Sequence, residues 1–389
     1  MATFHVPLKK TVDDSYDIEI GFNLFSTLIN DLKNGLFPKA NKLALITDSN
    51  VLPLYASNVI LAIKEEGFNI ELFDMPAGEH SKTRETKIRI EDEMLDKGFG
   101  RDSAIIALGG GVVSDLAGYL AGTFGRGIPF INYSTTLLSA ADASVGGKTA
   151  VDTPHATNLI GLFNQPQKVY IDIATWSTLP DREVRAGLAE TIKHACLADS
   201  AFFTWLEENI TRIASTKDAK LDAEACEFIA EANCRIKYDV VSRDEKEANL
   251  RQILNLGHTA GRAMETLFEY QLLHGECVAV GLSIQALLAN KLELISDEEH
   301  QRIDALIALC GLPTIVPEEI TTAKLVEKMY TDKKVRSGQI RFVLMDGIGS
   351  MKTFENGSYT KALTDEFLIE TIDEYRAAQV SLEVPPADK

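Results

Sequence analysis

Residues 102–118 read DSAIIALGGGVVSDLAG. A short apolar run, typical of a buried strand, ends in three consecutive glycines and is followed by a helical pattern. Three glycines let a backbone approach a ligand closely, and the free amides at a helix N-terminus suit a pyrophosphate. The stretch is not the GxGxxG fingerprint, and by itself it is equally compatible with a plain tight turn. It therefore predicts a strand–turn–helix unit and suggests a phosphate site.

Similar units surround this stretch. Strands and helices alternate through the first half of the chain, which implies a parallel, doubly wound sheet. From about residue 181 onward a 3.6-residue periodicity dominates, and beyond IRFVLM there is little strand signal. The sequence predicts an α/β N-terminal domain (Rossmann-like, mainly parallel sheet) over 1–183 and a mainly α-helical domain over 184–389. The expected strands are 42–51, 69–75, 102–110, 129–134 and 168–173.

Composition excludes several classes of protein. The 389 residues are 45% hydrophobic and 25% charged, which is ordinary for a globular protein long enough for two domains. The net charge of −18 argues against binding nucleic acid. No apolar run is long enough to span a bilayer, and the N-terminus lacks a signal-type apolar core. Five cysteines without CxxC spacing are expected to be small core residues, so a cytoplasmic protein is predicted.

Polar side chains follow several of the predicted strands. In doubly wound sheets, ligands bind at the carboxyl ends of the strands. Clusters at successive strand ends therefore suggest one dinucleotide crevice. These polar positions are Asp48, Asn50, Glu79, Lys82, Thr135, Thr136 and Lys148.

A second feature lies in RQILNLGHTAGRAMET. Arg251, Asn255, His258 and Arg262 are spaced 4, 3 and 4 residues apart, which places them on one face of a single α-helix. The other faces are apolar, so the helix is expected to be buried. A solvated polar face is the ordinary alternative, but the stripe lacks the Glu/Lys pairing of such a face. We interpret it as one wall of an anion-binding, metal-holding cleft.

Three residues form a candidate metal site. Glu190 precedes Lys193 by one helical turn in GLAETIKHA, His258 lies in the polar stripe, and His274 follows in LLHGE. Two His and one carboxylate are a ligand set typical of catalytic Zn²⁺. The ligands are far apart in sequence, so this set is not a local motif. The remaining histidines are interpreted as satisfied core residues: His5, His80, His155, His194 and His300.

Cations form a third group. Most Lys and Arg are solvated, but Lys193 and Arg251 lie within one or two helical turns of a proposed metal ligand. Arg suits a carboxylate and clustered Lys suits phosphate. The group contains Arg126, Lys148, Lys193, Lys237, Arg251, Arg262, Lys333 and Lys334.

Taken together, seven segments resemble the 3-dehydroquinate synthases of the sugar phosphate cyclase family. They are GGGVVSDLAG, TTLLSAADASVGGKTAVD, NLIGLFNQP, LPDREVRAGLAETIKHA, NLGHTAG, LLHGECVAVG and DKK, in the family's order from about residue 40 to 350. The resemblance implies a homodimer that uses NAD and Zn²⁺ (or Co²⁺). It implies a phosphate-eliminating lyase that converts 3-deoxy-D-arabino-heptulosonate 7-phosphate to 3-dehydroquinate. The implied steps are transient oxidation by NAD, phosphate β-elimination, re-reduction and intramolecular aldol closure.

The same resemblance implies roles for individual residues. The metal ligands would be Glu190, His258 and His274. The substrate carboxylate would contact Lys237 and Arg251. The phosphate would contact Lys148, Asn158, Asn255, Arg262 and Lys334, with Arg126 reaching in from a partner subunit. The groups near the reacting ring would be Asp142, Lys148, Lys193, Glu247 and Arg262. The NAD contacts would be Asp48, Asn50, Glu79, Lys82, Gly110, Gly111, Val112, Asp115, Thr135, Thr136, Leu138, Asp142, Lys148, Thr157, Asn158, Thr178, Leu179 and Glu183.

The chain departs from the family pattern at a few positions. Arg262 stands where the family has the second His of GHxxGH, and Thr157 stands where it has Lys; Ser114 replaces a common Gly and Ser134 a common Pro. Arg can bind phosphate but cannot act as a neutral acid or base. Alternative interpretations are a paralogous cyclase for a related heptose phosphate or amino analogue, and a catalytically weakened homologue that only binds NAD or phosphate sugars. A metal-dependent alcohol dehydrogenase is a third.

Overall fold

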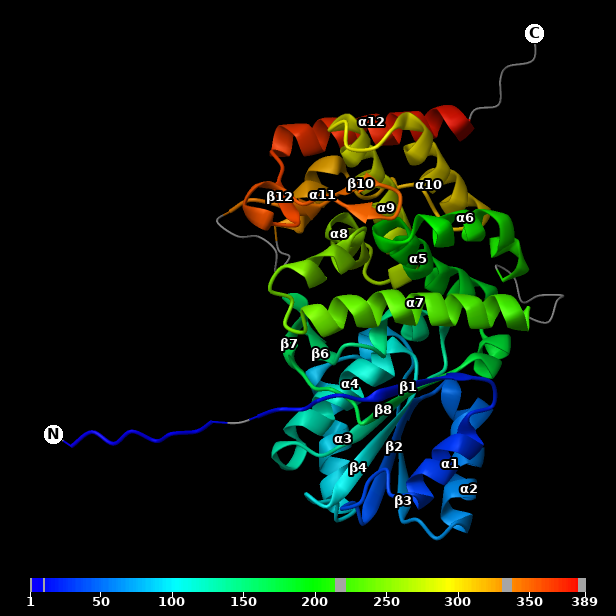
Figure 1. Ribbon diagram of the computed structural model, residues 1–389, viewed down its shortest axis with the longest axis vertical. Coiled ribbons are helices and arrows are strands. Elements are labelled where there is room, and N and C mark those ends of the chain that lie inside the picture. The colour runs from blue at the N-terminus through cyan, green and yellow to red at the C-terminus, as the bar shows by residue number, and fades with distance from the viewer. Residues whose placement is uncertain (1, 10, 214–221, 331–337, 384–389) are drawn as a thin grey trace.

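The computed structural model describes residues 2–9, 11–213, 222–330 and 338–383. Its N-terminal half is an α/β unit and its C-terminal half is mainly helical, with helix α7 (Ala223–Arg243) crossing between the two (Figure 1). In the described part of the chain, no helix combines the length and apolar character that crossing a membrane requires.

The α/β unit contains one six-stranded sheet in the order β1-β8-β5-β4-β2-β3, with every neighbouring pair parallel. Five of the strands were expected from the sequence. The edge strand β1 was missed because DIEIG is short and three of its five residues are acidic or glycine. The strands are β1 (Asp17–Gly21), β2 (Lys42–Asp48), β3 (Ile70–Met75), β4 (Ser103–Gly109), β5 (Phe130–Ser134) and β8 (Lys168–Asp172).

Helices cover both faces of this sheet. Side chains of α1 (Phe25–Lys33) and α2 (Ser57–Glu65) share one buried cluster with the sheet. Side chains of α3 (Arg84–Asp96) and α4 (Gly111–Thr123) share a second cluster on the other face. The predicted doubly wound fold is therefore confirmed. Short helical turns connect these elements: η1 (Leu52–Ala56), η2 (Glu79–Ser81), η3 (Phe124–Arg126), η4 (Ser139–Ala143) and η5 (Ile173–Thr178).

An antiparallel hairpin, β6 (Lys148–Thr153) and β7 (Ala156–Phe163), packs beside α4 (Figure 1). The sequence did not predict it, because its glycines and polar residues obscure the alternation of a strand. The hairpin approaches α4 closely at Gly118, where an added Cβ would lie 2.5 Å from Cγ2 of Thr149. A glycine is therefore needed for this packing.

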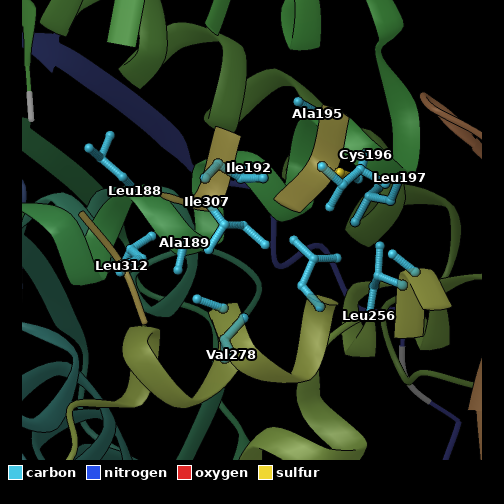
Figure 2. Close-up of a cluster of buried hydrophobic side chains, with 14 of the residues drawn as sticks. Leu188, Ala189, Ile192, Ala195, Cys196, Leu197, Leu256, Val278, Ile307 and Leu312 are labelled. Carbon is cyan, nitrogen blue, oxygen red and sulfur yellow. The ribbon is translucent and has the colours of Figure 1, made fainter. Parts of the chain in front are cut away.

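The helical half encloses the largest buried apolar cluster, part of which Figure 2 shows around Ile192 of α5 and Val278 of α9. All five cysteines are buried as free thiols, as predicted.

The chain also forms short strands in and after IRFVLM, which the sequence did not predict. Each has only two or three residues, which is too short for a detectable periodicity. The elements are α5 (Asp181–Ala198), α6 (Ser200–Asn209), η6 (Ile210–Arg212), η7 (Leu250–Asn255), α8 (His258–Leu267), α9 (His274–Lys291), α10 (Asp297–Leu309), α11 (Thr322–Met329), β9 (Arg341–Val343), β10 (Met345–Gly347), β11 (Ser350–Met351), η8 (Glu355–Gly357), β12 (Thr360–Ala362) and α12 (Asp365–Glu383).

The polar stripe does not lie on one α-helix, so that prediction is wrong. The 3-10 turn η7 ends at Asn255, and Gly257 adopts a left-handed conformation (φ 78°) before α8 begins at His258. The break follows from glycine's tolerance of positive φ. Its consequence is that His258 stands at the N-terminus of a helix. The expected burial is confirmed for Arg251, Asn255 and His258.

The position of His258 depends on a glycine contact between α9 and the turn before α8. A Cβ on Gly281 would lie 1.9 Å from the carbonyl oxygen of Gly257. The backbone would have to move to relieve this clash. We expect Gly281→Ala to lower the free energy of unfolding by about 3 kcal/mol, because overpacking forces the two helices apart. Thermal unfolding measures this. Gly100→Ala is the matched control, since its Cβ meets only the movable carboxylate of Asp102 at 3.0 Å; equal losses in both variants would contradict the prediction.

Candidate active site

Three helices bring Glu190, His258 and His274 together. Nε2 of His258 lies 3.5 Å from Oε1 of Glu190, and Nε2 of His274 lies 3.4 Å from the same oxygen. One ligand atom of each residue falls within 4.8 Å of the others. Glu190 comes from the buried middle of α5, while the two histidines are the first residues of α8 and α9. The predicted juxtaposition of these residues is therefore present in the structure.

Each imidazole is held with Nε2 directed at Glu190. Nδ1 of His258 donates a hydrogen bond to the carbonyl oxygen of Leu256 (3.0 Å). Nδ1 of His274 donates to Oε2 of Glu265 (3.2 Å). A hydrogen bond at Nδ1 fixes the tautomer and leaves the Nε2 lone pair for a cation, as in carboxylate–histidine–zinc groups. The chemistry of the donor set therefore fits Zn²⁺ or a similar divalent ion.

Two of the three side chains have the charge state that a cation needs. The exception is His274: burial lowers its pKa, but Glu265 and Glu190 outweigh burial and raise it to about 10, so this imidazole must lose a proton when a cation binds. Burial by itself raises the pKa of Glu190, but the ammonium of Lys193 overcomes this effect and holds the pKa well below its ordinary value. Burial and Lys193 hold the pKa of His258 well below its ordinary value, so this imidazole is neutral. Both carboxylate oxygens of Glu190 are buried without a hydrogen bond in the described structure. Such unsatisfied oxygens are expected where a ligand completes the site.

Next to this cluster, Asp142 of η4 connects two lysines. Nζ of Lys237 lies 2.5 Å from its Oδ1, and Nζ of Lys193 lies 3.8 Å from the same atom. Burial and the cations Arg251 and Lys193 together lower the pKa of Lys237 to about 8. The negative charge of Asp142 opposes this effect. The structure thus brings together three residues that the sequence placed in one polar site.

Arg251 is almost completely buried, with 1% of its surface exposed. Its Nη1 donates to the carbonyl of Glu245 (2.6 Å) and its Nη2 to the carbonyl of Gly146 (2.9 Å), while Nε has no hydrogen-bond partner in the described structure. The guanidinium also lies over the ring of Phe163, 5.5 Å from its centroid. Backbone carbonyls fix the guanidinium, and no carboxylate among the described residues forms an ion pair with it, so its positive charge is not compensated by a direct contact.

Lys148, Glu247 and Asn255 form a connected group at the hairpin side of the cleft. Glu247 accepts from Nζ of Lys148 (2.7 Å) through one oxygen and from Nδ2 of Asn255 (2.7 Å) through the other. Burial and the cations Arg251 and Arg262 lower the pKa of Lys148 against the opposing charge of Glu247, although its side chain is still 44% exposed. Glu247 neutralises one of these charges, so the positive charge expected for a phosphate site comes from Lys148 together with Arg251 and Arg262.

The expected cofactor residues line the carboxyl ends of β2, β4 and β5. Gly110 and Gly111 begin α4, and a Cβ on Gly110 would lie 3.1 Å from Cγ2 of Thr136. Asp48 accepts from the backbone N–H of Asn50 (2.8 Å), so it also stabilises the turn after β2. Three further expected positions are half-buried near these turns: Val112, Leu138 and Leu179. Thr135 is buried after β5, Thr157 is half-buried on β7, and Thr178 shares a hydrogen bond with Tyr55 (2.8 Å).

Two of these cofactor positions come from different halves of the chain. Burial raises the pKa of Glu183, on α5, and the charges of Glu276 and Asp48 add to the effect. Asp48, at the end of β2, is therefore close to the start of α5. Residues of both halves therefore lie close together here.

Lys82 is the centre of another cofactor group. Its buried ammonium contacts Glu79 and lies 3.4 Å from Oδ2 of Asp115 and 2.9 Å from Oδ1 of Asn158. Burial lowers its pKa, but the neighbouring carboxylates outweigh burial and raise it above the ordinary value. Lys82 is consequently a permanent cation.

One predicted residue lies away from the others, and a second cannot be placed. Arg126 is exposed on η3, at the end of α4 opposite the glycines, so a 13-residue helix separates it from the phosphate group of residues within one chain. Lys334 and its neighbour Lys333 lie outside the described residues.

Sequence reasoning missed three residues. His194, interpreted as a core residue, offers a ring nitrogen to a group with Asp142 and Glu190, and its Nδ1 pairs with Asn233 (3.0 Å). Glu265 and Asp152 are buried carboxylates at the site's edge. Glu265 follows His258 by seven residues on one helix face, a spacing that could have indicated it. The core interpretation was wrong for His5, His80 and His155, which are exposed.

Comparisons with known proteins show which family the chain belongs to. The 3-dehydroquinate synthase N-terminal model matches residues 72–186, and the C-terminal model matches 187–335. A 3-dehydroquinate synthase of Desulforamulus reducens is 47% identical over 82% of this chain and 88% of its own length. That of Pelobacter propionicus is 46% identical over 87% and 92%. The chain belongs to the 3-dehydroquinate synthase family.

Solved structures show the same fold at lower identity. A 2-epi-5-epi-valiolone synthase from Streptomyces hygroscopicus, with NAD⁺ and Zn²⁺ bound, superposes with a TM-score of 0.84 at 23% identity over 96% of this chain and all of its own. A 2-deoxy-scyllo-inosose synthase complexed with carbaglucose-6-phosphate, NAD⁺ and Co²⁺ gives 0.81 at 24% identity over 92% and 96%. A glycerol dehydrogenase from Schizosaccharomyces pombe gives 0.61 at 17% identity over 98% and 97%. The fold is thus shared by cyclases and dehydrogenases.

Glu265 provides a test of the cluster. We expect Glu265→Ala to weaken Zn²⁺ binding by about 10–100-fold, because His274 loses the carboxylate that orients its ring. Competition titration with a fluorescent chelator measures the affinity. Glu298→Ala, an exposed residue in the first turn of α10, is the control and should bind Zn²⁺ as the unmodified protein does. Unchanged affinity in E265A would show that His274 does not depend on this contact.

Proposed function

We propose that this protein is a 3-dehydroquinate synthase, a phosphate-eliminating lyase that converts 3-deoxy-D-arabino-heptulosonate 7-phosphate to 3-dehydroquinate. The observation that carries the proposal is the convergence of Glu190, His258 and His274 beside the cationic groups of one cleft. Membership of the family supports the same activity.

NAD and a divalent cation, Zn²⁺ or Co²⁺, are the cofactors of this proposal. The donor set of Glu190 and the two imidazoles supports the cation, and the glycine turn at the start of α4 supports the dinucleotide. Similar folds with these groups bound give further support. When bound, NAD⁺ takes up and returns a hydride while the cation acidifies the hydroxyl being oxidised.

The chain's own residues provide charge and orientation. Lys148, Asn255 and Arg262 hold the phosphate and stabilise its negative charge as it leaves. Lys193 places a buried ammonium beside the reacting ring and keeps Glu190 ionised. Glu247 holds Lys148 and Asn255 in one orientation, so the phosphate meets preset donors.

Lys237 and Arg251 favour a substrate that bears a carboxylate. Lys237 is buried with its ammonium against Asp142, and Arg251 is fixed 5.5 Å over the ring of Phe163. Two desolvated cations at one end of the cleft match a carboxylate, whereas sedoheptulose 7-phosphate offers none. This contrast favours the heptulosonate over the substrates of paralogous cyclases.

Arg262 and Thr157 motivate the second candidate, a weakened homologue that binds NAD or phosphate sugars without turnover. Arg262 cannot exchange a proton near neutral pH. Its positive charge nevertheless lowers the pKa of Lys148, so the two cations are close to each other. Two neighbouring cations are what a phosphate site requires. Arg262→His with Thr157→Lys should create activity only if the unmodified chain lacks it.

The remaining parts of the proposal concern organisation. We propose a homodimer, in which Arg126 of one protomer reaches the phosphate of its partner. The change from sheet to helices between β8 and α5 supports a domain boundary near residue 183. Five buried free thiols support a cytoplasmic location.

Phosphate release tests the function. With NAD⁺ and Zn²⁺ present, we expect the carboxylated heptulosonate phosphate to release phosphate without net NADH accumulation. Glu190→Gln should reduce the release to background, because the amide is a poorer ligand for the cation. Net NADH would indicate a dehydrogenase, preferential turnover of sedoheptulose 7-phosphate would indicate a paralogous cyclase, and absence of release would refute turnover.

The pKa of Lys237 predicts how substrate binding depends on pH. Lys237 is charged below about pH 8 and neutral above it, because burial lowers its pKa to about 8. We expect the KM for the heptulosonate to be constant below this pH and to rise above it, by up to tenfold per pH unit. Steady-state kinetics across pH 6–10 measures the rise. Lys237→Met should have a high KM at every pH, and an inflection near pH 8 that persists in K237M would disprove the assignment.

A further inference from the structure

Asp152 joins the hairpin to the segment that carries Lys82. It is 8% exposed and lies at an irregularity near the end of β6. Its Oδ1 accepts the backbone N–H of Asn158 (2.7 Å), and its own N–H donates to the carbonyl of Lys82 (2.6 Å). A β-bridge pairs it with Thr83. One residue therefore fixes two chain segments relative to each other.

The hydrogen bond to Asn158 supports an unusual backbone conformation. Asn158 has a φ of 53°, a left-handed conformation that is unusual for a residue other than glycine. Residues with a Cβ are disfavoured in the left-handed region, although Asn tolerates it better than most. The carboxylate of Asp152 stabilises this conformation because it accepts the backbone N–H of Asn158.

The conformation decides where the Asn158 side chain points. Oδ1 accepts from Nζ of Lys82 (2.9 Å), and this contact orients the amide. Within the described ranges, Nδ2 makes no hydrogen bond to another residue. The two N–H groups of Nδ2 are therefore available as donors, and amide donors suit the oxygens of a phosphate.

We propose that Asp152 is a positioning residue, which holds Asn158 in its left-handed conformation and thereby orients both Lys82 and the Asn158 amide toward a bound phosphate or pyrophosphate. This inference rests on the proposed function, because that function identifies the anion as the sugar phosphate or the cofactor. Asp152 acts through Asn158 and does not itself touch the ligand.

The oxygen of Asp152 matters more than its charge. Glu79, Asp115 and Asp152 all act on the single ammonium of Lys82, so this pocket has an excess of carboxylates. Burial raises the pKa of Asp152 to about 7, and the charge of Glu79 contributes. An asparagine at this position would keep an acceptor oxygen for Asn158 and remove the excess charge.

NAD⁺ titration of the full-length protein, followed by calorimetry, tests the inference without turnover. We expect Asp152→Ala to weaken NAD⁺ binding by about tenfold, which corresponds to the loss of one buried hydrogen bond. Asp152→Asn should keep the affinity within about threefold of the unmodified protein. If D152N binds as weakly as D152A, the charge and not the acceptor is required, and the proposal is wrong.

A double-mutant cycle tests whether Asp152 acts through Asn158. In an Asn158→Ala background, D152A should cause no further loss of NAD⁺ affinity, whereas additive losses would overturn the proposal. In turnover assays, D152A should raise the KM for the heptulosonate more than it lowers kcat. If the wild-type protein binds NAD⁺ but releases no phosphate, the proposed function is refuted. The double-mutant cycle can still be interpreted in that case, because it measures NAD⁺ affinity and not turnover.

Folding of D152A needs its own check. Glycine adopts positive φ without strain, so Asn158→Gly should restore the thermal stability that D152A loses. Recovery in D152A/N158G supports the mechanism even if D152A alone does not fold. A double variant as unstable as D152A would show that Asp152 stabilises the fold by another route and would overturn the inference.

Discussion

The site depends on one buried carboxylate. Glu190 has no exposed surface, and the Lys193 ammonium and two imidazoles surround it. An ionised carboxylate at such depth is expensive unless compensating charge is present. The compensation here is incomplete in hydrogen-bond terms, since both oxygens remain unsatisfied in the described structure. A divalent cation would remove this deficit, so the cluster links stability to ligand binding.

Close helix packing makes this arrangement possible. Gly257 and Gly281 let the turn before α8 approach α9 without side chains between them, and Gly275 approaches α5 in the same way at the carbonyl of Ala186. Each metal-site histidine therefore begins a helix that is packed at backbone distance against its neighbour. Rigid helix ends give the imidazoles fixed directions, which a loop could not provide.

The α/β half contributes positive charge, in contrast to the carboxylate of Glu190. Lys82 and the glycine turn before α4 follow the sheet strands β3 and β4, and Lys148 begins the hairpin strand β6, so cations and amides gather here although the chain as a whole carries −18. The hairpin β6–β7, which supplies Lys148 and Asn158, is thus as important to the cleft as the sheet. Anionic substrates are accommodated locally, while the remaining surface is acidic.

Sequence by itself determined the alternation of strands and helices and the doubly wound sheet, because periodicity is a local property. The cluster Glu190, His258 and His274 is not a local motif, and the sequence indicated it through ligand chemistry and the family resemblance. Only the tertiary structure decided that the polar stripe breaks at Gly257, that His194 and Glu265 join the site, and that Asp152 supports Asn158. These relations depend on backbone conformation and on contacts between helices that are distant in sequence. A pattern of residue types cannot specify them, since the same spacing is compatible with several backbone paths.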